Sequence, residues 1–529
     1  MSATSAVARR TFADARKRTF AFAYFFAAVA AVNVLGYRKS YPDLADRIKF
    51  ARSFGGNKAV RLFYGVPHDL LSTGGYAAWR VGGLMSIFAA MYGLLAAVRA
   101  LRAEEDAGRA ELVLANPVGR AAALRGALAG VLGGIALLWF ATWLGFVVTK
   151  LAVGPSAYLA LATVSPAAVF AGVGALTSQA AASRRVALEL GSVAVGAALL
   201  VRVVADTTGG ADWLRWVTPL GWSEQMRAFA GARPAVLLLP LIATALLLAV
   251  AVPIALRRDV GSGLLPERDS APPDHRLLGS PTRLALRLER GSLLGWLIGV
   301  GLFAFVIGIV SDSVSGIGIS KNLQQQLAKL GVGQVLTPSG YIAFSFLFFI
   351  LAVALFCCSQ MAAAYHDEAE QRLETLFSLP VSRTGWLAGR LLLAVAGAAA
   401  VALCAGVLAW AGAKSQGVHV SFGDLIEAGA NTLPASLLFL GIAALAFALV
   451  PRATAGIAYG LTTVAFVWEL FGALLGAPAW TLALSPFHHV ALVPAQSFRA
   501  GAAVAMLAIA AATSAAAVLI FERRDLTGP

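Results

Sequence analysis

Twelve apolar segments constrain this chain more than any other feature of its sequence. A transmembrane helix needs about 20 predominantly apolar residues. Segments of about this length lie at residues 19–36, 77–98, 122–148, 156–180, 186–205, 234–255, 291–310, 341–364, 386–411, 432–450, 453–475 and 501–521. Hydrophobic residues make up 59% of the chain, whereas soluble domains have about 45–50%. The sequence therefore predicts an all-α integral membrane protein with twelve transmembrane helices.

Basic clusters lie near both ends of the chain and in its middle. The formal net charge of +15 would suggest nucleic acid binding in a soluble protein, but these side chains flank apolar segments, where Lys and Arg mark the cytoplasmic side. They are Arg9, Arg10, Arg16, Lys17 and Arg18, then Arg257, Arg258, Arg268, Arg276, Arg283, Arg287 and Arg290, and finally Arg523 and Arg524. We expect a multi-pass protein of the plasma membrane, with both termini cytoplasmic, in contact with lipid and not with nucleic acid. The abundance of alanine, and of arginine over lysine, suggests a bacterial source.

Three short segments combine positive charge with an amphipathic pattern. Residues 9–18 and 283–290 directly precede the first span of each half, and their pattern suits a helix lying in the headgroup plane. Simple flanking charge is the alternative. In the first loop, residues 44–54 predict a cationic helix resting on outer-leaflet phosphates, with a solvated loop as the alternative.

A charged segment occurs twice, 263 residues apart. Residues 104–120, EEDAGRAELVLANPVGR, match residues 367–383, DEAEQRLETLFSLPVSR. Further matches at nearly the same spacing are Trp213 and Pro219 with Trp480 and Pro486, Arg185 with Arg452, and Gly75-Tyr76 with Gly340-Tyr341. Because six spans are an even number, both halves have the same orientation and form two parallel six-helix repeats. We predict a first half at residues 1–256, a proline-rich cytoplasmic linker at 257–282 and a second half at 283–529.

Each copy of the charged segment predicts a helix with an acidic face. Glu105 and Arg109 are spaced i,i+4, the favourable orientation for an ion pair on a helix, and Glu368 and Arg372 repeat this spacing in the second copy. Carboxylates seven residues apart share a helix face, which applies to Glu104 with Glu111 and to Asp367 with Glu374. We therefore expect helices at 104–115 and 367–378, ended by the proline that follows each.

At these residues the chain resembles the permease subunits of ABC-2 type exporters. Their loop between the second and third spans follows Glu-Glu-x-x-x-(Arg/Gly)-x-Glu-Leu-Leu-x-x-Leu-Pro-Val-(Ser/Gly)-Arg. The resemblance covers essentially the whole chain, and is closest to full-length bacterial permeases that export polyketide-type antibiotics and other drugs. It implies the ABC-2, type V exporter-like fold and a function in multidrug efflux. Asn116 and Thr375 stand where leucine is usual, which makes the two halves unequal.

In that family the charged segment is the coupling helix, which docks in a groove of the ATPase subunit. The resemblance assigns this contact to Glu104, Glu105, Arg109, Glu111 and Arg120 in the first half, and to Asp367, Glu368, Arg372, Glu374 and Arg383 in the second. A solvated loop helix with internal ion pairs is the alternative.

The family also has a short helical hairpin between the fifth and sixth spans of each half. Here the hairpins correspond to residues 212–229 and 480–498. A gating role would involve Trp213, Pro219, Trp480 and Pro486. Interfacial anchoring by the tryptophans is the alternative.

Two ionisable residues inside spans mark a candidate translocation path or gate. Arg202 aligns with Glu469 at an offset of 267, and pseudo-symmetry predicts that these opposite charges face each other across the interface between the halves. Charges at membrane depth are costly and usually serve a path or a partner. Phe466, Trp468 and Phe471 would supply the apolar walls that an amphiphilic ligand favours. A purely structural ion pair is the alternative.

An exporter needs an energy source, and this sequence has no Gly-x4-Gly-Lys-(Ser/Thr) phosphate-binding loop. We therefore expect no catalytic site, no metal site and no bound cofactor in this chain. ATP and Mg²⁺ would be held by separate ABC ATPase subunits, two copies in all, which drive outward movement of a hydrophobic or amphiphilic small molecule by alternating access. A proton-coupled 12-span secondary drug transporter is the first alternative. A membrane enzyme is the second, and it would require a cluster of His, Asp and Glu.

Overall fold

The computed structural model describes residues 2–56, 58–265, 279–312, 337–471 and 478–526. Within these ranges, 12 helices are long and apolar enough to cross a membrane, and no β-strand is found. The prediction of an all-α protein with twelve spans is confirmed. The chain divides into two compact units, residues 1–271 and 272–529. Half of the predicted linker, with Pro266, Pro272 and Pro273, lies outside the described residues.

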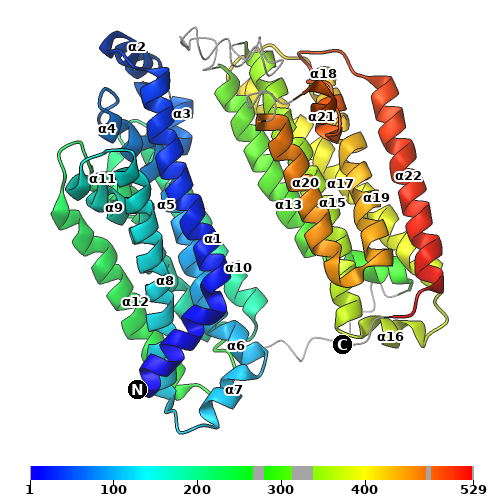
Figure 1. Cartoon of the computed structure of the whole chain (residues 1–529), viewed down its shortest axis with the longest axis horizontal. Coiled ribbons are helices and arrows are strands. Elements are labelled where there is room, and N and C mark those ends of the chain that lie inside the picture. The colour runs from blue at the N-terminus through cyan, green and yellow to red at the C-terminus, as the bar shows by residue number, and fades with distance from the viewer. Residues whose placement is uncertain (1, 57, 266–278, 313–336, 472–477, 527–529) are drawn as a thin grey trace. The chain divides into compact units, whose positions relative to one another are not determined.

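The first unit has six candidate spans joined by short helices. The elements are α1 (Ala3–Ser40), α2 (Leu44–Gly55), α3 (Lys58–Tyr64), α4 (Thr73–Ala77), the π-helix η1 (Ala78–Gly82), α5 (Gly83–Ala100), α6 (Arg102–Asp106), α7 (Arg109–Leu114), α8 (Arg120–Val148), α9 (Val153–Ala180), α10 (Arg184–Thr207), η2 (Asp212–Trp216), α11 (Pro219–Gln225), η3 (Pro234–Leu237) and α12 (Leu238–Arg257). Helices α6 and α7 lie at the end of the unit where the chain begins, and α2, α4 and α11 lie at the opposite end (Figure 1).

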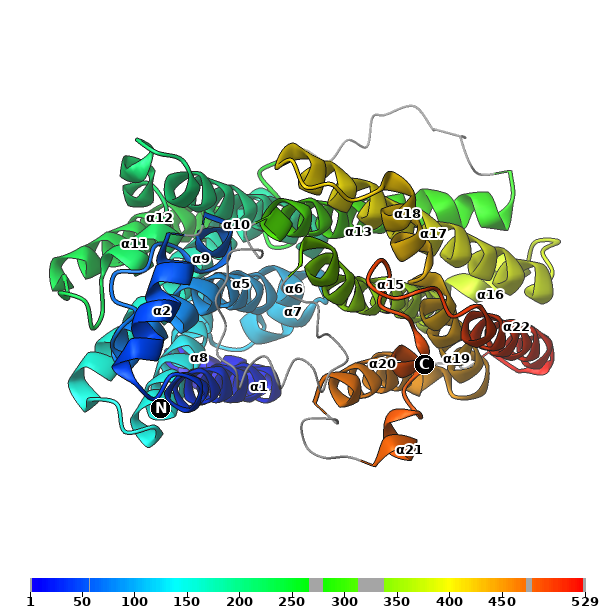
Figure 2. The same ribbon diagram turned by 90° about the horizontal axis from the view of Figure 1, so that it is seen from above.

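Small residues let the long helices of the first unit approach closely. Helix α1 packs along α8, and α5 packs along α9 (Figure 2). At Gly93 on α5, an added Cβ would lie 1.9 Å from the carbonyl oxygen of Ala167 on α9. No larger residue fits there without separating the helices. Close backbone approach at small residues is the usual way that membrane helices associate, because lipid tails supply no hydrophobic force between them.

The second unit repeats the pattern of six candidate spans. Its elements are α13 (Pro281–Ser311), α15 (Pro338–Ala369), α16 (Arg372–Phe377), α17 (Arg383–Ser415), α18 (Phe422–Ala430), α19 (Leu433–Leu449), η5 (Pro451–Ala453), α20 (Thr454–Phe471), α21 (Ala479–Leu482), η6 (Pro486–His489) and α22 (Ala500–Arg523). Several begin at the expected signals: Ser280, Thr337 and Ser382 each accept a bond from the backbone three residues on, at 3.1–3.2 Å. Such side-chain caps satisfy an otherwise unpaired N–H group at the start of a helix.

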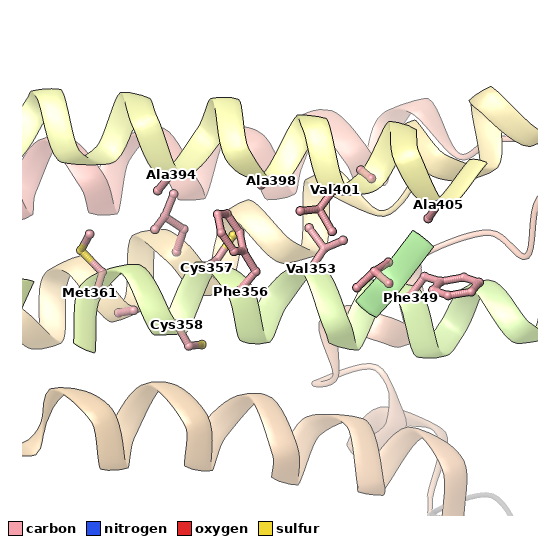
Figure 3. Packing of buried hydrophobic residues seen from close by; sticks show 14 of the residues in the cluster. Phe349, Val353, Phe356, Cys357, Cys358, Met361, Ala394, Ala398, Val401 and Ala405 are labelled. Carbon is pink, nitrogen blue, oxygen red and sulfur yellow. The ribbon is translucent and has the colours of Figure 1, made fainter. Parts of the chain in front are cut away.

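The core of the second unit lies between α15 and α17. Large side chains of α15, including Phe356 and Met361, pack against the alanine-rich side of α17 (Figure 3). Cys357 and Cys358 are buried in this core and are not disulfide-bonded. The combination of large side chains on one helix with small ones on the other allows dense packing.

The short amphipathic segments have two outcomes. Residues 44–54 form α2, so the predicted helix in the first loop is confirmed. Residues 9–18 and 283–290 are not separate helices, because they continue without a break into the spans of α1 and α13. The helices continue because no proline interrupts the sequence at either junction between the basic segment and the span that follows.

Candidate functional site

Each charged segment is a broken helix rather than the continuous helix that its spacing predicts. The break falls at Gly108 in the first copy and at Gln371 in the second, with φ angles of 68° and 59°. A left-handed residue cannot continue a right-handed helix, and it is costly for a side chain such as that of Gln371. Carboxylates on opposite sides of the break therefore do not share one helix face.

The break also changes which charges pair. Arg109 binds Glu104 through two bonds of 2.6 and 3.0 Å, and Arg372 approaches Asp367 at 3.2 Å. The two residues of each pair are five positions apart, and they lie on opposite sides of the left-handed residue. The predicted i,i+4 pairs of Arg109 with Glu105 and of Arg372 with Glu368 are wrong. The left-handed turn places each arginine beside the first acidic residue of its segment, Glu104 or Asp367, instead of the second. The hydrogen bond from Arg109 to Glu104 raises the pKa of this guanidinium.

In the first unit, Glu105 is bound by the end of the last span. Arg258, directly after α12, donates to both carboxylate oxygens of Glu105 at 2.6 and 2.8 Å. Arg120, the first residue of α8, donates to the carbonyl oxygen of Arg258 at 3.3 Å. The side chain of Arg258 is only 5% exposed. The segment between the second and third spans is therefore tied to the sixth span. We call Glu105, Arg120 and Arg258 the first latch.

The second unit has the same arrangement at matching positions. Arg524, directly after α22, donates to Glu368 at 2.5 Å, and Arg383 donates to the carbonyl oxygen of Arg524 at 2.5 Å. We call Glu368, Arg383 and Arg524 the second latch. The Glu368 side chain is 1% exposed. Sequence reasoning assigned the two arginines after the last spans only to topology, although the triplet Arg-Arg-Asp at 257–259 and again at 523–525 was a usable signal.

Beside each latch lies a buried arginine that the sequence analysis did not single out. In the first unit Arg102 is 1% exposed and forms ion pairs of 3.0 Å with Glu105 and Asp106. It also donates to the carbonyl oxygens of Ser262 and Gly261 at 2.8 and 2.7 Å. Such an arginine fixes the charged segment to the chain that follows the last span.

The second unit uses a different buried arginine. Arg390 on α17 is 4% exposed and binds Glu289 on α13 and Asp367 on α15. It therefore connects three spans, whereas Arg102 connects its own segment to the backbone that follows the last span. No short sequence pattern signals this difference, because Glu289 and Arg390 are 101 residues apart.

Several other residues of the two segments face outward. Glu111 and Glu374 are exposed, and the side chains of Arg109 and Arg372 are 46% and 57% exposed. Each segment also exposes one leucine, Leu112 at 67% in the first unit and Leu379 at 57% in the second. These two leucines are not at matching positions, since Thr375 corresponds to Leu112 and Asn116 to Leu379. The exposed part of each segment thus combines acidic, basic and apolar side chains.

At the opposite end of the first unit, Arg202 lies in a buried ion cluster. Its Nε atom is 2.6 Å from Glu224 and 3.4 Å from Asp206, and its side chain is 0% exposed. Asp206 also binds Arg215 at 2.7 Å, and Arg202 donates to the carbonyl oxygen of Gly83 at 2.8 Å. Burial raises the pKa of Glu224 to about 7, although Arg202 favours its ionised form. This arrangement favours the structural interpretation of Arg202, because all these partners lie in its own unit.

Glu469 has a more open environment. Its Oε1 atom is 3.3 Å from Nδ1 of His488, and the two side chains are 19% and 43% exposed. Inside its own unit each of the two charges thus has an ionic partner, and the pairing of Glu469 with Arg202 across the two halves stays a prediction. Sequence reasoning missed these partners because Asp206, Glu224 and His488 have no matching ionisable residue in the other half.

The aromatic residues near Glu469 divide between core and surface. Phe466 is 6% exposed and packs edge-on against Phe348 and Phe487. Trp468 donates its ring N–H to the carbonyl oxygen of Thr481 at 3.0 Å. These contacts attach the short helices that follow α20 to that span. The side chain of Phe471 lies outside the described residues.

The predicted hairpins between the fifth and sixth spans are short helical turns. Pro219 begins α11 and Pro486 begins η6. Trp213 and Trp480 are 63% and 69% exposed. Their exposure suits the anchoring role that tryptophan has at membrane interfaces. Among the described residues, no group of three or more His, Cys, Asp and Glu side chains could hold a metal ion.

Comparison with known proteins gives two matches. The model of the family described as "Multidrug efflux system permease Rv1217c, C-terminal domain" matches residues 53–254 and 278–522. The chain is also 33% identical over 501 residues to the multidrug efflux system permease protein Rv1217c of Mycobacterium tuberculosis. That alignment covers 94% of this chain and 90% of the relative.

Proposed function

The chain belongs to the family of the multidrug efflux system permease Rv1217c, and on this premise we propose that it is the membrane subunit of an ATP-driven ABC-2 exporter. Its two units are the proposed parallel repeats. In this proposal a separate ATPase binds ATP and Mg²⁺, with one copy under each charged segment. The cargo is a hydrophobic or amphiphilic drug-like molecule, and the termini and charged segments lie in the cytoplasm.

The duplicated charged segment carries this proposal. In both units it leaves the bundle between the second and third spans and exposes a glutamate, an arginine and a leucine. Interfaces combine an apolar centre with a polar rim, and one exposed leucine among charges suits such a contact. Two equivalent segments match a pair of ATPase copies.

The latches suggest how movement of an ATPase would reach the spans. Glu105 and Glu368 are bound to the arginines that follow the sixth span of each unit, and Arg120 and Arg383 begin the third span. A displacement of the charged segment is therefore transmitted to the second, third and sixth spans together. In the proposed mechanism, ATP-driven closure of the ATPases displaces both segments, and the units alternate between inward and outward access.

Affinity purification of the tagged chain in mild detergent, followed by mass spectrometry, tests the class of transporter. We expect a stoichiometric ABC ATPase in the purified complex, and drug efflux from proteoliposomes that requires both ATP and this subunit. A monodisperse chain without an ATPase, which moves drug when a proton gradient is applied, would overturn the proposal in favour of a proton-coupled secondary transporter.

A further inference from the structure

A cavity of about 180 Å³ lies inside the first unit, at the end that carries the charged segment. Its walls come from the beginning of α1, the last turns of α5, both α6 and α7, the beginning of α8 and the end of α12. Figure 1 shows α6 and α7 at this end of the unit, beside the start of α1. A cavity holds its first water at roughly 10–15 Å³, so this one has room for an organic group.

Part of the wall and the inner end of the cavity are apolar or uncharged. Val7, Ala96, Leu114, Ala127 and Val131 contribute apolar surface. At the inner end, the hydroxyl groups of Thr19 and Tyr92 are bonded to each other at 3.1 Å. A ligand group that enters this far therefore meets hydrocarbon and a hydroxyl pair that is already satisfied. This environment favours an alkyl or aryl group over a charged one.

The ionisable residues of the cavity are Arg10, Asp14, Arg99, Glu104, Glu105 and Arg120. Two of the carboxylates are already bound by arginines outside the cavity lining, Glu104 by Arg109 and Glu105 by Arg258.

Two of the arginines that line the cavity, Arg10 and Arg120, have weaker partners. Arg10 lies 3.7 Å from Asp14 and 3.9 Å from Glu104, beyond hydrogen-bond length. Arg120 is exposed and makes one 3.3 Å bond to a carbonyl oxygen. Among the carboxylates only Asp14 is held as loosely, at 3.7 Å from Arg10. The lining therefore offers guanidinium groups to an incoming acid more readily than it offers carboxylates to a base.

We propose that this cavity binds an anionic amphiphile, whose apolar group enters between α1, α5 and α8 and whose acidic head group is held by Arg10 and Arg120. The ligand is either an acidic compound that the protein exports or an anionic lipid of the bilayer. Because Glu105 and Arg120 belong to the first latch, an occupant would contact the same residues that tie the charged segment to the last span. The link to export rests on the proposed function, whereas binding itself does not.

The test uses the purified full chain in neutral-lipid nanodiscs, without ATPase or ATP. The probe is a fatty acid that carries a photoreactive diazirine in its alkyl chain, and the labelled peptides are identified by mass spectrometry. We expect labelling at residues that line the cavity, and much weaker labelling by the corresponding fatty alcohol. Absence of labelling at the cavity, or equal labelling by acid and alcohol, would overturn the proposal.

Variants separate specific binding from general membrane partition. The double variant Arg10→Glu with Arg120→Glu should lower cavity labelling roughly tenfold, the effect of losing a charge-assisted hydrogen bond. Arg125→Glu is the matched control, because Arg125 is exposed on the same helix, outside the cavity lining, and it should leave labelling unchanged.

A third substitution tests whether the probe occupies the cavity, because it fills the cavity with a large side chain. Ala127→Phe fills the cavity and should abolish labelling without changing the charge, and Ala96→Phe serves if the former does not fold. Labelling that persists in a folded filled variant would contradict the assignment.

Nanodiscs that contain phosphatidylglycerol distinguish the two sources of ligand. Loss of cavity labelling in these nanodiscs assigns the site to lipid, and retained labelling assigns it to an acidic solute. Failure of ATP-driven efflux would contradict the proposed function alone, since none of these binding measurements involves ATP.

Discussion

The charged ends of the two units share one device and differ in another. Both have a latch in which the arginine after the sixth span binds the second acidic residue of the charged segment. The buried arginine beside the latch differs. Arg102 pairs with two carboxylates of its own segment and binds backbone carbonyls after the last span, whereas Arg390 bridges carboxylates on two other spans. The comparison teaches that the ion pair between the charged segment and the arginine after the sixth span is formed at matching positions in both units. The buried arginine that fixes the charged segment to the helix bundle stands at different positions.

The opposite ends of the units differ more. Arg202 belongs to a closed cluster of four charges, whereas Glu469 meets a half-exposed histidine. A buried charge depends on its partners because water cannot replace them. The same change of charge should therefore have a large effect in the first unit and a small one in the second.

Replacement of Arg202 by Leu should have the largest effect of any change considered. It leaves Glu224 and Asp206 buried without their shared cation, and loss of one partner of a buried pair costs about 3–5 kcal/mol. We expect a folded yield close to zero, or a midpoint of thermal unfolding in detergent many degrees below that of the wild type. An unchanged midpoint would show that the cluster is not closed, and Arg185→Leu, at an exposed pair, is the matched control.

Charge reversal at the latches should have the next largest effect. Arg258→Glu and Arg524→Glu should each destabilise their unit by about 2 kcal/mol, the scale of hydrogen bonds to charged groups. The neighbouring substitutions Arg257→Glu and Arg523→Glu are matched controls, because those arginines are exposed. Thermal unfolding and ATP-dependent efflux are the measurements.

A swapped pair sharpens this test. Glu368→Arg combined with Arg524→Glu should recover part of the lost stability and efflux, because opposite charges again face each other. If the double variant is worse than both single variants, the latch does not act as a pair.

Reversal of the exposed glutamates should act on binding and not on folding. Glu111→Lys with Glu374→Lys should weaken capture of the ATPase roughly tenfold, since removal of complementary charge at an interface costs about 1–2 kcal/mol. Thermal unfolding of the isolated chain should not change, which distinguishes these residues from the latches. Undiminished capture by the double variant would remove the proposed docking role.

Substitution of the exposed leucines should show which position each charged segment uses for its apolar contact with the ATPase. Leu112→Asp and Leu379→Asp should each weaken capture of the ATPase by about 1 kcal/mol, because each removes apolar area from the proposed contact. Their counterparts in the other unit, Thr375→Asp and Asn116→Asp, should have a smaller effect. Equal effects at all four positions would mean that the difference between the segments does not matter for docking.

Substitution of Glu469 by Gln should have only a small effect on stability. Its partner His488 is 43% exposed, and partly exposed ion pairs contribute less than about 1 kcal/mol. We expect an unfolding midpoint near that of the wild type, with any change confined to drug efflux. Destabilisation as large as that of Arg202→Leu would contradict the contrast between the two ends.

Much of the fold and part of the candidate site could be predicted from the sequence alone. The twelve spans and the helix at residues 44–54 follow from local hydrophobic and charge patterns. The two charged segments were located correctly, but their helices were predicted as continuous, since a single left-handed residue at Gly108 or Gln371 leaves the surrounding pattern unchanged.

Only the tertiary structure decided which charges meet. Arg258 reaches Glu105 across 153 residues, and Arg524 reaches Glu368 across 156. Arg202 finds Glu224 in a different helix of its own unit. The physical reason is the range of the forces involved. Transfer of an apolar segment into lipid depends on that segment alone, so sequence determines the spans. Pairing of buried charges depends on where packed helices bring them together, which no local pattern contains.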